Sequence, residues 1–201
     1  MKLFYAPGAC SLAAHIVLEE IGQPYQAETV DLRAKKTASG ADYFAINPRG
    51  AVPALEISAG NVLTQGAAIL QYLGDNSALP AFKPASGSVE RARLQEALGF
   101  IGDMHKAFGG LFNPNLDDAG RTTVVAEIIR RMTQFEAMLP EAGPYMLGEF
   151  SQADAYAFTI INWSRNVDTI DLANFPRIAA LMSAVGARPA TLAALKAEGL
   201  I

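Results

Sequence analysis

Cys10 is the residue whose type and position most suggest chemistry. It is the only cysteine of the chain, and it lies between a short apolar run at residues 2–5 and a helical pattern that begins at Ser11. Unpaired amides and the positive end of a helix dipole favour an anion at a helix start. A thiol there ionises more easily than a free one, and the thiolate is the reactive form. The alternative is a buried, inert cysteine, and the position supports the two interpretations about equally.

Two further places could bind a peptide-like ligand through the backbone. Pro53 opens a strand-like run and cannot donate a ladder hydrogen bond. If the Val52–Pro53 bond is cis, Val52 directs its N–H and C=O outward, where an extended ligand could pair with them. An ordinary trans turn proline is the more frequent case. Gln65 and Gly66 open a helix whose amides could hold a carboxylate, although a helix start that needs a small residue explains them better in isolation.

The histidines and the paired lysines are weaker signals. His105 and Lys106 are neighbours on a long predicted helix, so their side chains point about 100° apart. A solvated pair is the simpler interpretation of those two residues. His15 lies among apolar residues and is predicted to be structural. Lys35 begins a lysine pair in a polar loop, which is usually a solvated pair of charges.

Ser151 and Asp154 precede an apolar helical run and form a variant of the capping box, in which each side chain bonds the backbone N–H of the other. This motif is structural. No glycine-rich phosphate loop and no GxSxG elbow occurs in the chain, so a hydrolase is disfavoured. Two histidines and one cysteine are too few for a convincing metal site.

The elements that must position these residues change character near residue 80. Residues 1–78 predict the order βαβαββα, and residues 79–87 form a linker with Pro80, Pro84 and Gly87. Residues 88–201 predict helices only. The strands are expected at 2–5, 28–32, 52–57 and 61–63, with helices at 11–21, 43–46 and 66–73, then at about 89–112, 121–139, 152–166, 175–186 and 189–198. The fold class is therefore an α/β domain followed by an all-α domain.

Composition limits the function further. The 201 residues are 51% hydrophobic and 18% charged, with a net charge of −4, as in an ordered globular protein. No basic face is implied, so neither nucleic acid nor an anionic membrane is an expected partner. The N-terminus lacks a signal-peptide pattern, and no apolar run approaches the ~20 residues that span a bilayer. We therefore expect a cytoplasmic protein.

Several short motifs are weak signals singly, but their order along the chain is specific. They are Lys2-Leu3-Phe4-Tyr5, Pro7-Gly8-Ala9-Cys10-Ser11, Asn47-Pro48-Arg49-Gly50, Val52-Pro53-Ala54-Leu55, Leu63-Thr64-Gln65-Gly66-Ala67-Ala68-Ile69, His105-Lys106-Ala107-Phe108, Ala153-Asp154-Ala155-Tyr156, Arg188-Pro189 and Glu198-Gly199-Leu200. With these motifs the chain closely resembles the bacterial beta-class glutathione S-transferases, and the resemblance extends over essentially its whole length. It implies a thioredoxin-like glutathione-binding domain, a helical domain with a pocket for a small hydrophobic electrophile, a homodimer, a role in detoxification, and glutathione as co-substrate without a metal.

The resemblance also implies roles for single residues. By position, Cys10 matches the family cysteine beside the glutathione sulfur, and His105 matches the histidine that faces it; these are the two expected catalytic residues. Val52, before the structural Pro53, matches the residue whose backbone pairs with the cysteinyl unit. The other expected glutathione contacts are Gln65 and Gly66 at the γ-glutamyl end, Lys35, Asp103 and Met104.

Two departures from the family pattern affect these expectations. Position 65 is commonly Glu in the class and is Gln here, which predicts weaker but surviving binding. A family asparagine falls on Leu98 or Gly99, neither of which can replace its hydrogen bond. Gly99 and Gly102 each cost about 1 kcal/mol inside a helix, and their spacing suggests close contact with another domain or subunit.

The predicted function is conjugation of glutathione to small electrophiles. Thiol–disulfide exchange through Cys10 is a second activity that the residues leave open. The alternatives are a non-catalytic glutathione- or ligand-binding protein and a specialised dehalogenase, lyase or isomerase that depends on glutathione.

Overall fold

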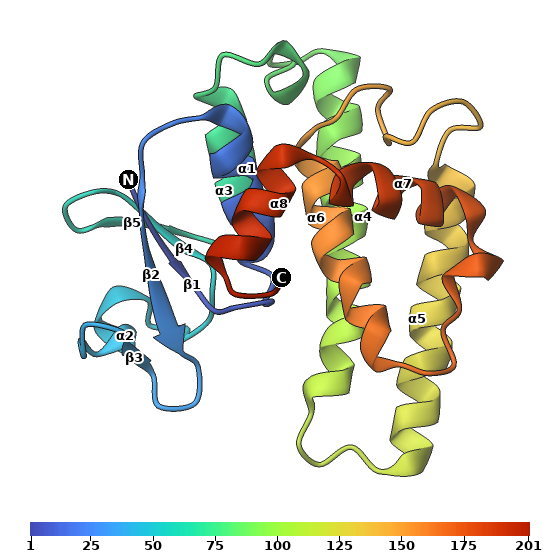
Figure 1. Ribbon diagram of the computed structural model, residues 1–201, viewed down its shortest axis with the longest axis horizontal. Coiled ribbons are helices and arrows are strands. Elements are labelled where there is room, and N and C mark those ends of the chain that lie inside the picture. Colours follow the sequence, from blue (N-terminus) through green and yellow to red (C-terminus); the bar gives the residue numbers. More distant parts are fainter. The chain divides into compact units, whose positions relative to one another are not determined.

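The computed structural model describes all 201 residues. It divides into two compact units, drawn in Figure 1: Met1–Lys83 together with Ala187–Ile201, and Pro84–Gly186. The sequence placed all of residues 88–201 in one helical domain. The structure instead groups the last residues with the first unit, because the C-terminal helix packs on an N-terminal one.

The first unit contains a five-stranded mixed sheet. In the order β3-β2-β1-β4-β5, only the pair β1 and β2 is parallel. The two-residue β3 was not expected, since it lies in a polar stretch without strand pattern. The remaining order is the predicted βαβαββα of a thioredoxin-like fold. The strands are β1 (Lys2–Tyr5), β2 (Gln26–Asp31), β3 (Lys36–Thr37), β4 (Ala54–Ser58) and β5 (Asn61–Thr64).

The helix α1 (Leu12–Ile21) is the centre of this unit. It packs against α3 (Gly66–Asp75) and α8 (Pro189–Ala197), and Figure 1 shows α8 beside it. Every residue from Leu12 to Leu18 is buried, since these neighbours and the sheet cover α1 on several sides. The helix ends at Gly22, whose φ of 64° is a left-handed conformation that glycine adopts without strain. The remaining short helices are α2 (Tyr43–Ile46) and the 3₁₀ turn η1 (Pro80–Phe82).

The second unit is helical, as the sequence predicts. Its central helix is α6 (Gln152–Ile161), in which every residue is buried. Long helices α4 (Val89–Gly109) and α5 (Asp118–Met138) pack against each other, and α4 and α7 (Pro176–Gly186) pack against α6. Three 3₁₀ turns complete the unit: η2 (Gly110–Phe112), η3 (Asn162–Asn166) and η4 (Leu172–Asn174).

Local side-chain bonds explain where these helices begin. Asp117 accepts from the Gly120 N–H, so α5 starts at Asp118 rather than at the expected residue 121. The capping box predicted before α6 is confirmed: the Ser151 N–H donates to Asp154 Oδ2 at 2.8 Å, and Ser151 Oγ accepts from the helix. Asp154 Oδ1 also accepts from the Met146 N–H at 2.8 Å. Asp154 thus fixes both the start of α6 and the loop before it.

No single helix is long and apolar enough to cross a membrane, while α7 and α8 taken together as a bent pair satisfy those criteria of length and composition.

Candidate active site

Cys10 lies in the turn that joins β1 to α1. Ser11 closes this turn from within, because its hydroxyl accepts from the Ala6 N–H at 3.2 Å. The Cys10 thiol is half-buried and donates to the carbonyl oxygen of Val52, 3.1 Å from Sγ. The predicted neighbours Cys10 and Val52 are therefore in direct contact.

Of the two interpretations of Cys10 that the sequence left about equal, the structure favours the buried thiol that does not ionise easily. Burial raises the pKa of the thiol to about 11, against the smaller lowering effect of the N–H groups of Cys10 and Ser11. The helix-start amides do face the sulfur, as the sequence suggested. Loss of hydration outweighs them, because removing a charged sulfur from water costs more than these two hydrogen bonds return.

Val52 is held by the segment before it. The Val52–Pro53 peptide bond is cis, which the sequence left open. Two side chains from the preceding helix and turn hold the adjacent Ala51 carbonyl: Tyr43 Oη at 2.9 Å and the buried Asn47 Nδ2 at 2.7 Å. The Val52 N–H has no hydrogen-bond partner within the chain. This amide is thus a free donor beside the Cys10 thiol.

Lys35 and Gln65 share an unusual backbone conformation. They are the two non-glycine residues of the chain with positive φ, at 55° and 73°. Such conformations cost of order 1–3 kcal/mol and gather at functional sites. Lys35 Nζ donates to the Gly50 carbonyl at 2.8 Å, so the loop after β2 is joined to the segment before β4. The two residues with this strained backbone are both among the glutathione contacts that the family resemblance implies.

Gln65 is also the residue that immediately precedes α3. Its side chain is exposed and makes no capping hydrogen bond to the helix. The first amides of an α-helix lack intrahelical acceptors and attract an anion, with the help of the helix dipole. The Gly66 end of α3 therefore offers amides that can hold an anion such as a carboxylate.

Strand register brings these residues to one end of the sheet. Phe4, Ala54 and Thr64 lie in line on β1, β4 and β5. The Cys10 turn follows β1, Val52 precedes β4, and Gln65 follows β5, so all three lie just beyond that line. The strand β2 runs parallel to β1 and leads to Lys35 at the same end. Five of the predicted contacts, Cys10, Lys35, Val52, Gln65 and Gly66, are thus gathered in the first unit.

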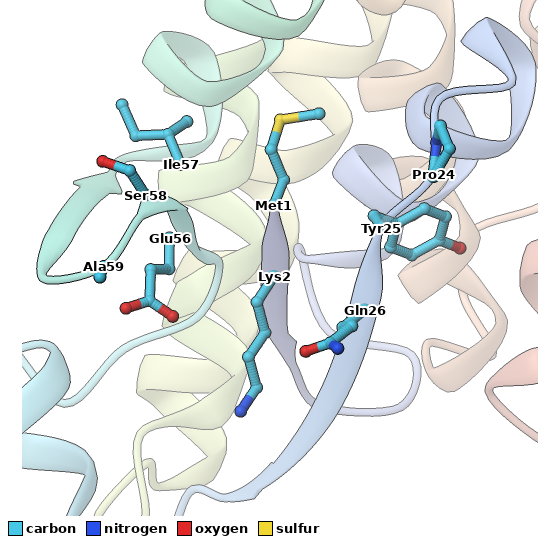
Figure 2. A pocket seen from close by; sticks show the side chains of 9 residues that line it. All are labelled: Met1, Lys2, Pro24, Tyr25, Gln26, Glu56, Ile57, Ser58 and Ala59. Atoms are coloured by element: carbon cyan, nitrogen blue, oxygen red, sulfur yellow. The ribbon is translucent and has the colours of Figure 1, made fainter.

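A groove of about 490 Å³ lies at the opposite end of the same sheet. Figure 2 shows it around the start of β1 and the end of β4, lined by Met1, Lys2, Pro24, Tyr25, Gln26, Glu56, Ile57, Ser58 and Ala59. None of the candidate residues lines it. The candidate chemical groups lie at the other end of the sheet.

His105 occupies an aromatic setting in the second unit. Its Nδ1 lies 2.8 Å from Tyr156 Oη, and its ring makes an edge contact with Trp163 at 5.2 Å between centroids. Burial lowers the pKa of His105 below its ordinary value of 6.5. Burial thus favours the uncharged form of the ring. Phe108 and the exposed Phe112 pack edge-on against the same Trp163.

The remaining predicted residues of α4 differ in their exposure. Asp103 is exposed and lies 3.6 Å from Arg131 of α5, beside a hollow of about 440 Å³ that Lys106 also lines. Met104 is fully buried in the helical core, where the spacing of α4 places it on the inner face. Its side chain is not available to glutathione, so it is not part of the site that we propose.

The family asparagine has no substitute in this structure. Leu98 is buried, whereas Gly99 is exposed on α4. A Cβ added at Gly99 or Gly102 would meet no atom within 4 Å. Nothing in the helical unit therefore makes use of the close approach that the two glycines allow.

The sequence did not indicate Glu198 as part of the site region. Its carboxylate accepts from the Gly8 N–H at 2.8 Å and lies 2.9 Å from His15 Nδ1. His15 is structural, as predicted. No local pattern links residues that are 190 positions apart, and only the packing of α8 on α1 reveals the contact.

Comparison with known proteins agrees with this geometry. A family model described as "Glutathione S-transferase, N-terminal domain" matches residues 8–76. The chain is 40% identical to glutathione S-transferase GstA of Escherichia coli O157:H7 over 201 residues, covering both chains in full. The chain therefore belongs to the glutathione S-transferase family.

Solved structures define the class within that family. A bacterial beta-class glutathione S-transferase of Sphingomonas chungbukensis has 40% identity and a TM-score of 0.92, with 100% of each chain covered. A sphingomonad glutathione S-transferase in complex with glutathione has 41% identity and the same TM-score and coverage. The protein is a member of the bacterial beta class, and it is an enzyme.

Proposed function

We propose that this enzyme conjugates glutathione to small hydrophobic electrophiles, and that the gathered residues of the first unit hold the tripeptide. The free Val52 amide pairs with the cysteinyl unit. The Gly66 end of α3 holds the carboxylate of the γ-glutamyl end, Gln65 accepts from its ammonium group, and Lys35 supplies a positive charge for the other carboxylate. The single observation that carries the proposal is this convergence of a free amide, a helix start and a thiol at one end of the sheet.

Cys10 acts in this scheme as a protonated thiol. With a pKa of about 11 it keeps its hydrogen at neutral pH and can donate to the glutathione sulfur beside Val52. A donor aimed at the sulfur stabilises the glutathione thiolate, which is the nucleophile in conjugation. This role favours conjugation over disulfide exchange, because exchange needs the Cys10 thiolate as attacking group.

The second unit contains the other residues to which the family resemblance gives a role. His105 is the second proposed catalytic residue, as the family resemblance implies. Asp103 contributes a polar contact to glutathione. The aromatic rings around Trp163 form an apolar surface suited to a small electrophile. We also propose that the enzyme is a homodimer and works in the cytoplasm in detoxification, with glutathione as its co-substrate and no metal.

The first test is turnover. Purified enzyme with glutathione and 1-chloro-2,4-dinitrobenzene is expected to release chloride and form the conjugate. Absence of turnover, with glutathione binding intact, would favour a non-catalytic binding protein. Assays with a haloalkane, an ether and an isomerisable substrate, each with glutathione, test the dehalogenase, lyase and isomerase alternatives.

The second test concerns the γ-glutamyl end. Gln65→Glu restores a charge that pairs with the ligand ammonium group. It is expected to tighten glutathione binding by up to about fivefold in calorimetry, since one exposed ion pair contributes at most about 1 kcal/mol. Gln26→Glu makes the same change in the groove of Figure 2 and serves as the matched control. Equal effects of the two variants would contradict the assignment of Gln65.

A further inference from the structure

Glu198 is a buried carboxylate that follows the last helix of the chain. It lies at the C-cap of α8, and its side chain has no exposed surface. One oxygen, Oε2, accepts from the Gly8 N–H at 2.8 Å, and the other, Oε1, lies 2.9 Å from Nδ1 of the buried His15. Buried carboxylates persist only where such hydrogen bonds replace water.

The Gly8 contact bears directly on the Cys10 turn. Gly8 has a φ of 70°, and it stands two residues before Cys10. A Cβ at Gly8 would lie 3.6 Å from the side chain of Leu200, so the C-terminal residues also cover the turn from outside. Ser11 restrains the turn at its other end through Ala6. Within the turn, the Ala9 N–H also donates to the Ala6 carbonyl at 3.0 Å. The turn is therefore held from within at Ala6, and Glu198 holds Gly8 from a distant part of the chain.

The position of Glu198 depends in turn on how α8 is fixed. Arg188, at the start of α8, forms an ion pair with Glu20 near the end of α1. Glu198, at the other end of α8, contacts His15 in the middle of α1. The two attachments set α8 along α1, so that its carboxyl end reaches the turn before Cys10.

We propose that Glu198 is a positioning residue for Cys10. By holding the Gly8 amide it fixes the turn, and the turn directs the Cys10 thiol at the Val52 carbonyl, where the glutathione sulfur binds. The effect on catalysis rests on the proposed function, whereas the effect on the Cys10 thiol does not. A purely structural role predicts instead that changes at Glu198 alter stability alone.

The experiment uses the rate at which iodoacetamide alkylates Cys10, the only cysteine, and the dissociation constant of glutathione, both measured well below each variant's unfolding temperature. Glu198→Ala removes the acceptor of the Gly8 N–H, so the turn loosens and Cys10 becomes more accessible to iodoacetamide. A displacement near 1 Å at a reacting group can lower a reaction rate by up to about a hundredfold. We expect alkylation to become at least tenfold faster and glutathione binding about tenfold weaker. Glu198→Gln keeps an acceptor for Gly8 and a polar partner for His15, so it should restore both values to within about threefold of wild type.

Glu20→Ala is the matched control, because it loosens the other end of α8 without touching Gly8. It should lower stability and leave both values unchanged. The proposal is overturned if Glu198→Ala keeps wild-type alkylation and binding, or if Glu20→Ala reproduces its effects. Should Glu198→Ala not fold, Glu198→Asp shortens the same contact by one methylene and must show the same changes in smaller degree; wild-type values in that variant would also refute the proposal. Faster alkylation in a protein that never binds glutathione would uphold the positioning role and reject the proposed function.

Discussion

The ionisation of Cys10 is open to a direct titration, since the chain has no other cysteine. A pKa of about 11 leaves about one thiol in 10⁴ ionised at pH 7, against about three in 100 for a free thiol of pKa ~8.5. The thiolate population is thus roughly 300-fold smaller. A more basic thiolate is intrinsically more nucleophilic, with a Brønsted coefficient near 0.4–0.5, which recovers about tenfold. The expected alkylation rate at pH 7 is therefore roughly 30-fold below that of a free thiol.

The pH profile separates ionisation from access. Limited access to the half-buried sulfur lowers the rate at every pH, whereas the thiolate population sets the position of the inflection. With iodoacetamide, we expect the rate to rise about tenfold per pH unit up to at least pH 10, with folding monitored by circular dichroism. The same protein in denaturant should level off near pH 9. A plateau of the folded protein at or below pH 8.5 would refute the argument that desolvation outweighs the helix-start amides.

Three further outcomes follow from the second unit. Replacing both Gly99 and Gly102 with Ala should raise the free energy of unfolding by about 1 kcal/mol per site in urea titrations, because no atom lies near the added methyls. Weaker dimer association in sedimentation experiments would show instead that subunits meet at these glycines. Asp154→Ala should lower the free energy of unfolding by about 2–3 kcal/mol, since it leaves the N–H donors of Met146 and Ser151 without acceptors, and a loss under about 0.5 kcal/mol contradicts that. The NMR titration midpoint of His105 should fall below 6.5, because burial disfavours its charged form; a midpoint above 6.5 would mean that a nearby anion dominates.

Much of the fold was predictable from local signals. Gly22 at the end of α1 and the prolines at the starts of α7 and α8 mark boundaries that the structure reproduces within a few residues. The short β3 was missed because its pairing with β2 is tertiary and its residues are polar. The grouping of α8 with the first unit was also missed, since an amphipathic pattern shows that a helix packs but not on which partner.

The candidate site was predictable in part, for reasons that differ between residues. Cys10 and Gly66 stand at helix starts that the sequence reveals. The positive φ of Lys35 and Gln65 is invisible in sequence, because ordinary side chains avoid it and only the surrounding fold imposes it. The ionisation of Cys10 stayed open in the sequence, because burial is a property of the packed structure. Met104 was carried over by resemblance, although its place on the inner face of α4 buries it.

The central claim is that glutathione binds at the end of the sheet where β1 leads into the Cys10 turn. Amide chemical-shift mapping of the ¹⁵N-labelled enzyme with added glutathione tests it most directly. The account predicts the largest shifts at the amides of Cys10, Val52 and Gly66. Largest shifts at Gln26 and Ser58, in the groove at the other end of the sheet, or no shifts at millimolar glutathione, would contradict it.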